Sequence, residues 1–238
     1  MFDDTLLNDL KTKLGKHGFV KAENIFSKKI KNKLTNEALF QINKSQTNKI
    51  SLRLSKQDSK FIKLITSEEL DYFFNKIFSK KFDLNTNSFL CMFSFNNTNK
   101  KILKTESINK FHFDGYLYTV ILPINLDNDD GIDTSLYIFP LLRSKLSKFM
   151  FSNFVIKIFF QNILINKIIN FMVRKEILNP VRIQLNQNEI LIFNGYNSLH
   201  AGIDNINQNT KCRLILHIFE DQQISKFEKY LNDKNKNR

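Results

Sequence analysis

Apolar and polar positions follow two different patterns along the chain. Up to about residue 86, apolar residues recur every three or four positions, which is the spacing of one face of an α-helix. Such runs cover residues 3–17, 24–39 and the segment after Ser67, and a short strand-like step at Phe19 separates the first two. From residue 87 onward, apolar residues gather in short runs. The sequence therefore predicts a mostly helical N-terminal part, residues 1–86, followed by a β-rich core, residues 87–220.

The short apolar runs of the second part have the length of strands. They cover residues 88–95, 116–126, 135–139, 181–185, 189–193 and 212–219. Clusters of Asn, Asp and Gly separate them, most clearly at 127–131, 187–188 and 205–209. Such spacing favours an antiparallel sandwich or barrel. We expect a single domain over residues 1–238, mainly β with flanking helices (α+β), that ends in a helix or tail at 221–238.

A helical insertion is expected within the strands, over about residues 141–177. Its polar residues recur every four positions and leave a broad apolar face. The polar residues are Asn153, Lys157, Gln161, Asn162, Asn166, Asn170 and Arg174, and the apolar face includes Phe151, Phe154, Val155, Ile158, Phe159, Ile165, Ile169 and Met172. The pattern predicts a helix or helix pair packed on the sheets. Three other interpretations stay open for residues 149–173: a homodimer interface, a lid over an apolar substrate, or contact with a membrane surface.

The charge balance is strongly basic, with 36 Lys and Arg against 23 Asp and Glu. A formal net charge of +13 raises nucleic acid or an anionic membrane as partners. The lysines between residues 11 and 33 are scattered rather than interleaved with aromatic residues on one element. Lys, Asn, Ile and Phe are abundant together, as A/T-rich codons would produce. We therefore expect nucleic acid to be an unlikely partner.

Cysteine usage and the apolar segments bear on location. Cys91 and Cys212 are the two cysteines of the chain, and they lack the spacing of a secreted disulfide scaffold. The N-terminus starts acidic and shows no secretory signal pattern. Polar residues interrupt the most apolar stretch, 149–173, so no transmembrane segment is expected. These features favour a cytoplasmic protein.

The first candidate for chemistry is the pair His112 and Asp114, at the entry to the strand expected at 116–126. In an extended segment, residues two apart point to the same face, so this imidazole and this carboxylate would converge. A neutral imidazole with a carboxylate suits a divalent iron-type ion. A second histidine would complete a facial triad of ligands with open coordination positions.

A second histidine and an arginine follow later in the chain. His200 comes after the apolar run 189–193 and a turn, and Arg213 lies thirteen residues further on (213 minus 200). Arg213 sits inside an otherwise apolar strand, where a cation is costly unless an anion meets it. A planar guanidinium is suited to bidentate capture of a carboxylate.

In this order, the motifs resemble the Fe(II)/2-oxoglutarate-dependent dioxygenase superfamily. Residues 14–20, Leu-Gly-Lys-His-Gly-Phe-Val, resemble the opening of its phytanoyl-CoA dioxygenase-like branch. The resemblance implies a double-stranded β-helix (jelly-roll, cupin-like) core, with His112, Asp114 and His200 as catalytic iron ligands. It implies that Arg213 pairs with the distal carboxylate of 2-oxoglutarate. The implied reaction uses Fe(II), O2 and 2-oxoglutarate as cosubstrate, releases succinate, and hydroxylates a small or carrier-linked metabolite.

Three further residues are candidates for the cosubstrate pocket. His217 lies four positions after Arg213, on the same face of the expected strand, and Tyr118 and Thr119 could hydrogen-bond the cosubstrate. Ordinary packing is an alternative for each of them. The position six after Arg213 is Phe219, so the R-x5-R ending of the alkylated-base demethylases is missing. That departure argues against nucleic-acid repair.

Two other functional classes remain open on the sequence. One is a cupin-type protein that binds a metal without oxygenase turnover. The other is a basic module that binds nucleic acid or anionic lipid through the Lys-rich N-terminal third and the 149–173 helix. The second alternative leaves Arg213, inside an apolar strand, without an explanation.

Overall fold

The structure is a computed structural model that describes residues 3–47, 49–54, 60–78, 89–97, 107–124, 134–143, 155–156, 159–160, 162–186, 189–204 and 210–218. Its helices are α1 (Asp4–His17), α2 (Lys28–Ser45), α3 (Lys60–Ile65), α4 (Glu68–Phe78) and α6 (Ile163–Arg174). Its strands are β1 (Phe19–Glu23), β2 (Lys49–Leu54), β3 (Phe89–Asn97), β4 (Ser107–Ile108), β5 (Tyr118–Pro123), β6 (Thr134–Phe139), β7 (Val181–Leu185), β8 (Glu189–Phe193), β9 (Leu199–Asp204) and β10 (Thr210–Ile218).

In the described part of the chain, the strands form two antiparallel sheets. One sheet has the order β1-β8-β5-β10-β3-β2, and the other has the order β4-β9-β6-β7. The sheets bury apolar side chains against each other. Ile121 and Phe193 of the first sheet share one buried cluster with Leu136 and Ile183 of the second. The predicted antiparallel β core is therefore present, and its two sheets face each other.

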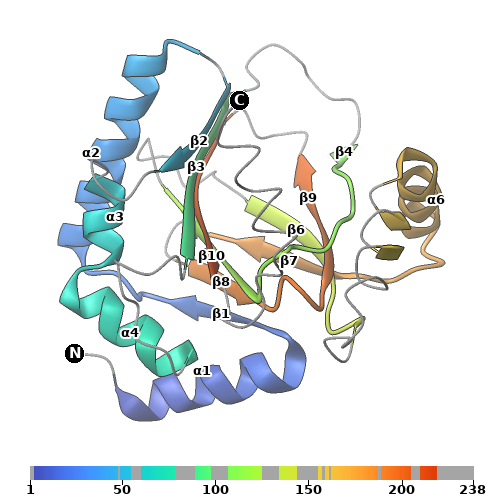
Figure 1. Cartoon of the computed structure of the whole chain (residues 1–238), viewed down its shortest axis with the longest axis horizontal. Coiled ribbons are helices and arrows are strands. Elements are labelled where there is room, and N and C mark those ends of the chain that lie inside the picture. The colour runs from blue at the N-terminus through green and yellow to red at the C-terminus, as the bar shows by residue number, and fades with distance from the viewer. Residues whose placement is uncertain are drawn as a thin grey trace.

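Helices cover the outer face of the six-stranded sheet and pack together with it in one large buried cluster. In Figure 1, α1 to α4 lie on one side of the sheets and α6 lies on the other. Alternate residues of strand β10 point to the two faces of the six-stranded sheet. Cys212, Leu214 and Leu216 are buried in the cluster shared with the helices. The alternate residues, Arg213 and His217, therefore face the second sheet, where the candidate site lies.

The first helix and its end follow the sequence closely. Asp3 caps α1 by accepting a hydrogen bond from the Thr5 backbone N–H at 2.9 Å. Gly18 ends the helix in the left-handed conformation, with φ 76°, which glycine adopts at little cost. A Cβ at Gly18 would also come within 2.7 Å of the Leu141 side chain. The helix predicted at 3–17 is thus confirmed to within one residue.

The N-terminal part contains more strand than predicted. Its two strands, β1 and β2, form opposite edges of the six-stranded sheet. Strand β2 falls in a stretch that the sequence analysis treated as helical, and the short α3 was also missed. In β2, Ile50 is buried whereas Ser51, Leu52 and Arg53 are exposed, so its apolar pattern is weak.

The second helix was predicted too early, at residues 24–39. Helix α2 begins at Lys28 because the Ser27 side chain caps it by accepting from the Ile30 backbone N–H at 3.4 Å. Asn24 has φ 55°, which is incompatible with a continuous right-handed helix. The helix then runs past residue 39 and ends at Ser45.

The helical insertion, predicted at about 141–177, differs from the structure at both ends. Residues 141–143 form a turn, and α6 ends at Arg174, because Glu176 has φ 57° and Pro180 cannot continue a helix. Ile169 of the predicted apolar face is buried, as expected. Asn166 of the predicted polar stripe is buried as well. The residues of α6 that stay exposed instead include Ile163, Leu164, Ile168 and Phe171.

Several predicted segments lie outside the described residues. They are the turns at 127–131, 187–188 and 205–209, the tail at 221–238, and residues 144–154, 157–158 and 161 of the insertion. Among the helices that the structure does describe, none combines the length and hydropathy needed to cross a bilayer.

Candidate metal centre

The segment between β4 and β5 crosses from one sheet to the other and carries the His-x-Asp pair. His112 exchanges two backbone hydrogen bonds with His200 of β9, at 2.9 and 3.0 Å. Two residues later, the Asp114 backbone N–H donates to the Gly195 carbonyl at 3.0 Å. The chain is therefore extended here, so His112 and Asp114 project toward the same side. The backbone pairing also places the His200 imidazole next to that of His112, with ring centroids 4.4 Å apart.

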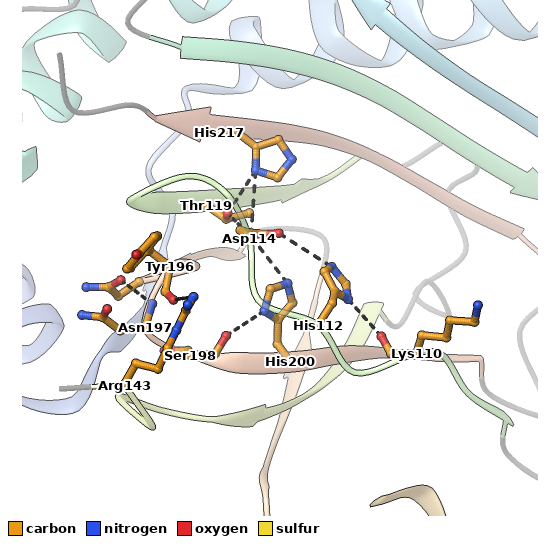
Figure 2. Close-up of polar contacts among 11 residues, drawn as sticks. Lys110, His112, Asp114, Thr119, Arg143, Tyr196, Asn197, Ser198, His200 and His217 are labelled. Carbon is orange, nitrogen blue, oxygen red and sulfur yellow. Dashed lines mark hydrogen bonds and ion pairs between the residues drawn. The ribbon is translucent and has the colours of Figure 1, made fainter. Parts of the chain in front are cut away.

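These three side chains converge, as Figure 2 shows. His112 Nε2 lies 3.7 Å from Asp114 Oδ1, and His200 Nε2 lies 3.5 Å from Asp114 Oδ2. One ligand atom from each residue lies within 4.8 Å of the other two. The three residues that the sequence analysis named as metal ligands are thus brought together, and His200 lies inside β9, a strand that was not among those predicted.

The remaining nitrogen of each imidazole has a backbone partner. His112 Nδ1 lies 2.9 Å from the Lys110 carbonyl oxygen, and His200 Nδ1 lies 3.0 Å from the Ser198 carbonyl oxygen. A carbonyl only accepts, so both Nδ1 atoms carry the proton. Both Nε2 atoms face Asp114, and in the neutral ring with Nδ1 protonated this is the nitrogen whose lone pair can bind a metal. Fixing the tautomer through the second ring nitrogen is how metal-binding histidines are commonly oriented.

Burial differs among the three residues and shifts their pKa values. The side chains of Asp114 and His200 are 8% and 7% exposed, whereas that of His112 is 43% exposed. Burial lowers the pKa of His200 to about 4, so its imidazole is neutral at pH 7. Burial alone would raise the pKa of Asp114, but His200, His217 and His112 hold it below its usual range. The centre therefore presents a carboxylate and neutral imidazole nitrogen.

Two of the candidate cosubstrate residues support the carboxylate. Thr119 Oγ1 donates to Asp114 Oδ2 at 2.5 Å, and His217 Nδ1 lies 3.1 Å from the same hydroxyl oxygen. Because the hydroxyl proton is directed at Asp114, His217 Nδ1 is the donor of the second hydrogen bond. His217 also stacks on Tyr116, with ring centroids 4.3 Å apart. Thr119 and His217 are cross-strand partners on β5 and β10, which explains their proximity.

The other two candidates lie apart from this cluster. Tyr118 faces the helical layer, where its ring lies 4.8 Å from that of Phe78. Neighbouring strand residues point to opposite faces, so Tyr118 and Thr119 are separated by the sheet. Arg213 is half-buried on the same face of β10 as His217, four residues earlier, or about 13 Å along the strand.

The donor set fits a divalent transition metal. Two imidazole nitrogens and one carboxylate oxygen on one side of a point form the two-histidine, one-carboxylate arrangement typical of non-haem iron, with positions left open for other ligands. The buried Asp114 carboxylate has three imidazoles around it and no permanent cation among the ion-pair partners described for it. A bound cation would supply that missing charge.

Sequence reasoning missed Gly195 as a residue of the centre. A Cβ at this position would lie 2.5 Å from Asp114 Oδ2 and 2.7 Å from Thr119 Oγ1. Because these two atoms form the hydrogen bond that supports the carboxylate, a side chain at position 195 must displace Asp114, Thr119 or both. The signal available in the sequence was a glycine two residues after the end of an apolar strand, a residue type that permits close approach of another part of the chain.

We expect Gly195→Ala to weaken metal binding about tenfold, as the loss of a group that orients a ligand commonly does. Calorimetric titration of the metal-free protein with Mn²⁺ measures the effect. Gly15→Ala is the matched control, because a Cβ at Gly15 meets nothing within 4 Å. Equal affinity of both variants and the wild type would show that the backbone at 195 can retreat without moving Asp114.

Comparison with known proteins gives a fold and no sequence relative. No protein-family model and no curated protein matches the sequence. A prolyl-4-hydroxylase from Pseudomonas putida matches at TM-score 0.55 and 12% identity, over 90% of this chain and 98% of that one. SnoN, a non-haem α-ketoglutarate-dependent epimerase from nogalamycin biosynthesis, matches at TM-score 0.58 and 9% identity, over 91% and 84%. A prolyl hydroxylase from Trichoplax adhaerens matches at TM-score 0.55 and 13% identity, over 92% and 91%. The chain therefore has the same fold as these hydroxylase and epimerase structures.

Proposed function

We propose that this protein is an Fe(II)- and 2-oxoglutarate-dependent oxygenase. The observation that carries the proposal is the convergence of His112, Asp114 and His200 within 4.8 Å, with both histidine Nε2 atoms turned toward the Asp114 carboxylate. The facing antiparallel sheets are consistent with a double-stranded β-helix core. The structures of the same fold include enzymes that are described as using α-ketoglutarate and iron. Assignment to the phytanoyl-CoA dioxygenase-like branch stays a prediction.

The residues of the centre have two kinds of role, binding the metal and orienting the residues that bind it. His112, Asp114 and His200 would hold the iron, which supplies oxidative chemistry with O2 and 2-oxoglutarate at its open positions. Thr119 and His217 keep Asp114 ionised and oriented by a chain of two hydrogen bonds. The bonds to the Lys110 and Ser198 carbonyls keep the imidazoles turned toward the metal.

Arg213 is proposed to bind the distal carboxylate of 2-oxoglutarate. It lies on the face of β10 that is turned toward the second sheet, and it shares this face with His217. Its cross-strand partner on β5 is Pro123, so it lies further along the sheet than Thr119, which pairs with His217. A diacid with one carboxylate at the metal and the other at Arg213 would lie between the two sheets.

The substrate is proposed to approach from the side of His112. This imidazole is the most exposed of the three, whereas Asp114 and His200 are enclosed.

We propose a small or carrier-linked metabolite as substrate and hydroxylation as the reaction. Fold neighbours that include both hydroxylases and an epimerase support the oxidative class.

The test is succinate formation from 2-oxoglutarate after anaerobic loading with Fe(II) and exposure to air, with and without mixtures of candidate metabolites. Succinate is expected from the wild type, and chelation or His200→Ala is expected to remove it. Iron binding without consumption of 2-oxoglutarate would favour a cupin-type metal protein. Absence of both iron and 2-oxoglutarate binding would overturn the proposal.

A further inference from the structure

Asn166 connects α6 to the strand segment that carries His112. The residue is 3% exposed, and both ends of its amide are bonded. Its Oδ1 accepts from the Phe111 backbone N–H at 2.5 Å. Its Nδ2 donates to the Phe160 carbonyl and, at 3.3 Å, to the Asn162 carbonyl. The Asn166 amide therefore fixes Phe111, the residue before His112. The Phe160 and Asn162 carbonyls at the start of α6 fix the amide in turn.

The segment 109–112 pairs with β9 on one edge, and the bond from Phe111 to Asn166 gives it a partner elsewhere. On that edge, the Asn109 and His112 backbone N–H groups donate to Gly202 and His200 of β9, each at 2.9 Å. Asn109 and His112 are three residues apart, so the chain is irregular between them, and the Phe111 N–H, adjacent to that of His112, is bonded to Asn166 and not to β9. At Phe111, the Asn166 side chain takes the place of a neighbouring strand.

The same helix makes a second, longer contact with this segment. Asn170, one turn after Asn166, donates from Nδ2 to the Ile108 carbonyl at 3.5 Å. Below these polar contacts, Ile169 and Val173 share a buried cluster with Phe111 and Phe113, the residues on either side of His112. Side chains of α6 thus contact both the backbone and the side chains of the segment that carries His112 and Asp114.

The position of His112 depends on this backbone more than that of His200 does. The His112 side chain is 43% exposed and has little packing around it, whereas the His200 side chain is enclosed. Its imidazole is aimed by the backbone and by the Lys110 carbonyl. A small displacement at Phe111 therefore passes directly to His112 Nε2.

We propose that Asn166 is a positioning residue for the metal centre, which acts by fixing the backbone that presents His112. This inference rests on the proposed function, because it takes the cluster to be a metal site. Asn166 has no contact with the ligand atoms among its described bonds, so its effect would reach the metal through Phe111 and His112.

The experiment compares Asn166→Ala and the nearly isosteric Asn166→Leu with Ile169→Ala. Ile169 lies on the same helix and in the same cluster, but it makes its contact by packing alone. Both Asn166 variants are expected to bind Mn²⁺ about tenfold more weakly, the lower end of what loss of an outer partner costs. Ile169→Ala is expected to lower the unfolding temperature and leave affinity near that of the wild type. Amide hydrogen exchange at Phe111, followed by NMR, should accelerate in the Asn166 variants and not in Ile169→Ala.

The outcomes separate the inference from the function. Wild-type affinity in a folded Asn166→Leu protein would overturn the inference and leave the metal site standing. Equal losses of affinity in the Asn166 and Ile169 variants would reduce Asn166 to a packing residue and also overturn it. If the wild type binds no divalent metal, both the proposed function and the inference fail. If Asn166→Ala does not fold, Asn166→Leu and the Phe111 exchange rate decide the matter.

Discussion

Asp114→Ala is expected to abolish iron binding and succinate formation. Asp114 supplies the one carboxylate of the candidate ligand set and lies within 3.7 Å of both histidine Nε2 atoms. Without it, two imidazoles remain and the anionic ligand is lost. The loss in metal affinity should exceed about a hundredfold, which is the upper end for removal of a mere outer partner. Calorimetric titration with Mn²⁺ and a succinate assay measure the two effects.

The experiment needs variants that separate chemistry from folding. Asp114→Asn keeps the size of the side chain and a carbonyl oxygen that can accept from Thr119, so it tests the charge alone. Asp9→Ala removes an exposed carboxylate of α1 that pairs with Lys13, far along the chain from the centre, and should change neither quantity. Turnover at the wild-type rate in a folded Asp114→Ala protein would exclude Asp114 as a ligand.

Arg213→Ala is expected to raise the KM for 2-oxoglutarate by about 10- to 100-fold while metal affinity stays unchanged. A hydrogen bond to a charged group contributes about 1.5–3 kcal/mol, and each 1.4 kcal/mol corresponds to a factor of ten. Arg213 lies about 13 Å along β10 from His217, so its loss should leave the ligand cluster intact. Steady-state kinetics at saturating iron, with Mn²⁺ titration in parallel, separate the two parameters.

A pair of comparison variants sharpens the result for Arg213. Arg213→Lys keeps the charge and loses the planar fork, so its KM should fall between those of the wild type and the alanine variant. Arg53→Ala removes an exposed arginine from β2 in the same sheet and should leave the KM unchanged. An unchanged KM in Arg213→Ala would mean that another cation binds the distal carboxylate.

The part of the site that the sequence could predict is the part that depends on spacing within a strand. His112 and Asp114 are two residues apart, which places them on one face wherever the segment is extended. The same rule could have separated Tyr118 from Thr119, since adjacent strand residues cannot both face the metal. Tyr118 instead packs on Phe78 in the helical layer.

The rest of the site depends on contacts between distant segments. Gly195 matters because Asp114 approaches it, and that approach is set by the pairing of the 109–114 segment with β9 and with the turn after β8. Asn166 looked like a member of a solvent-facing stripe because asparagine is usually exposed. Its burial follows from a backbone N–H of Phe111 that has to be satisfied, and no periodicity in α6 encodes that requirement.

The missed strand β2 shows a similar limit in the fold. It is an edge strand that pairs with β3 on one side, and Ile50 is buried while its next three neighbours are exposed. Alternation is weak where so little of a strand is covered, so the pairing partner rather than the local pattern defines it. In contrast, β7 and β8 match the predicted bounds, 181–185 and 189–193, because in the sequence Pro180 precedes the first and a run of Asn and Gln separates the two.

The backbone pairing of His112 with His200 joins residues 88 positions apart (200 minus 112), on a segment that leads into one sheet and on a strand of the other. The unfolded chain holds these two imidazoles at no fixed separation, so an ion that contacts both would bind only the folded chain. By thermodynamic linkage, such an ion would stabilise the folded chain by an amount that rises with the logarithm of its free concentration once that concentration exceeds its Kd. Metal affinity and the free energy of unfolding are then coupled. A substitution that weakens the contact between the sheets would therefore lower metal affinity even if the residue touches none of the ligands.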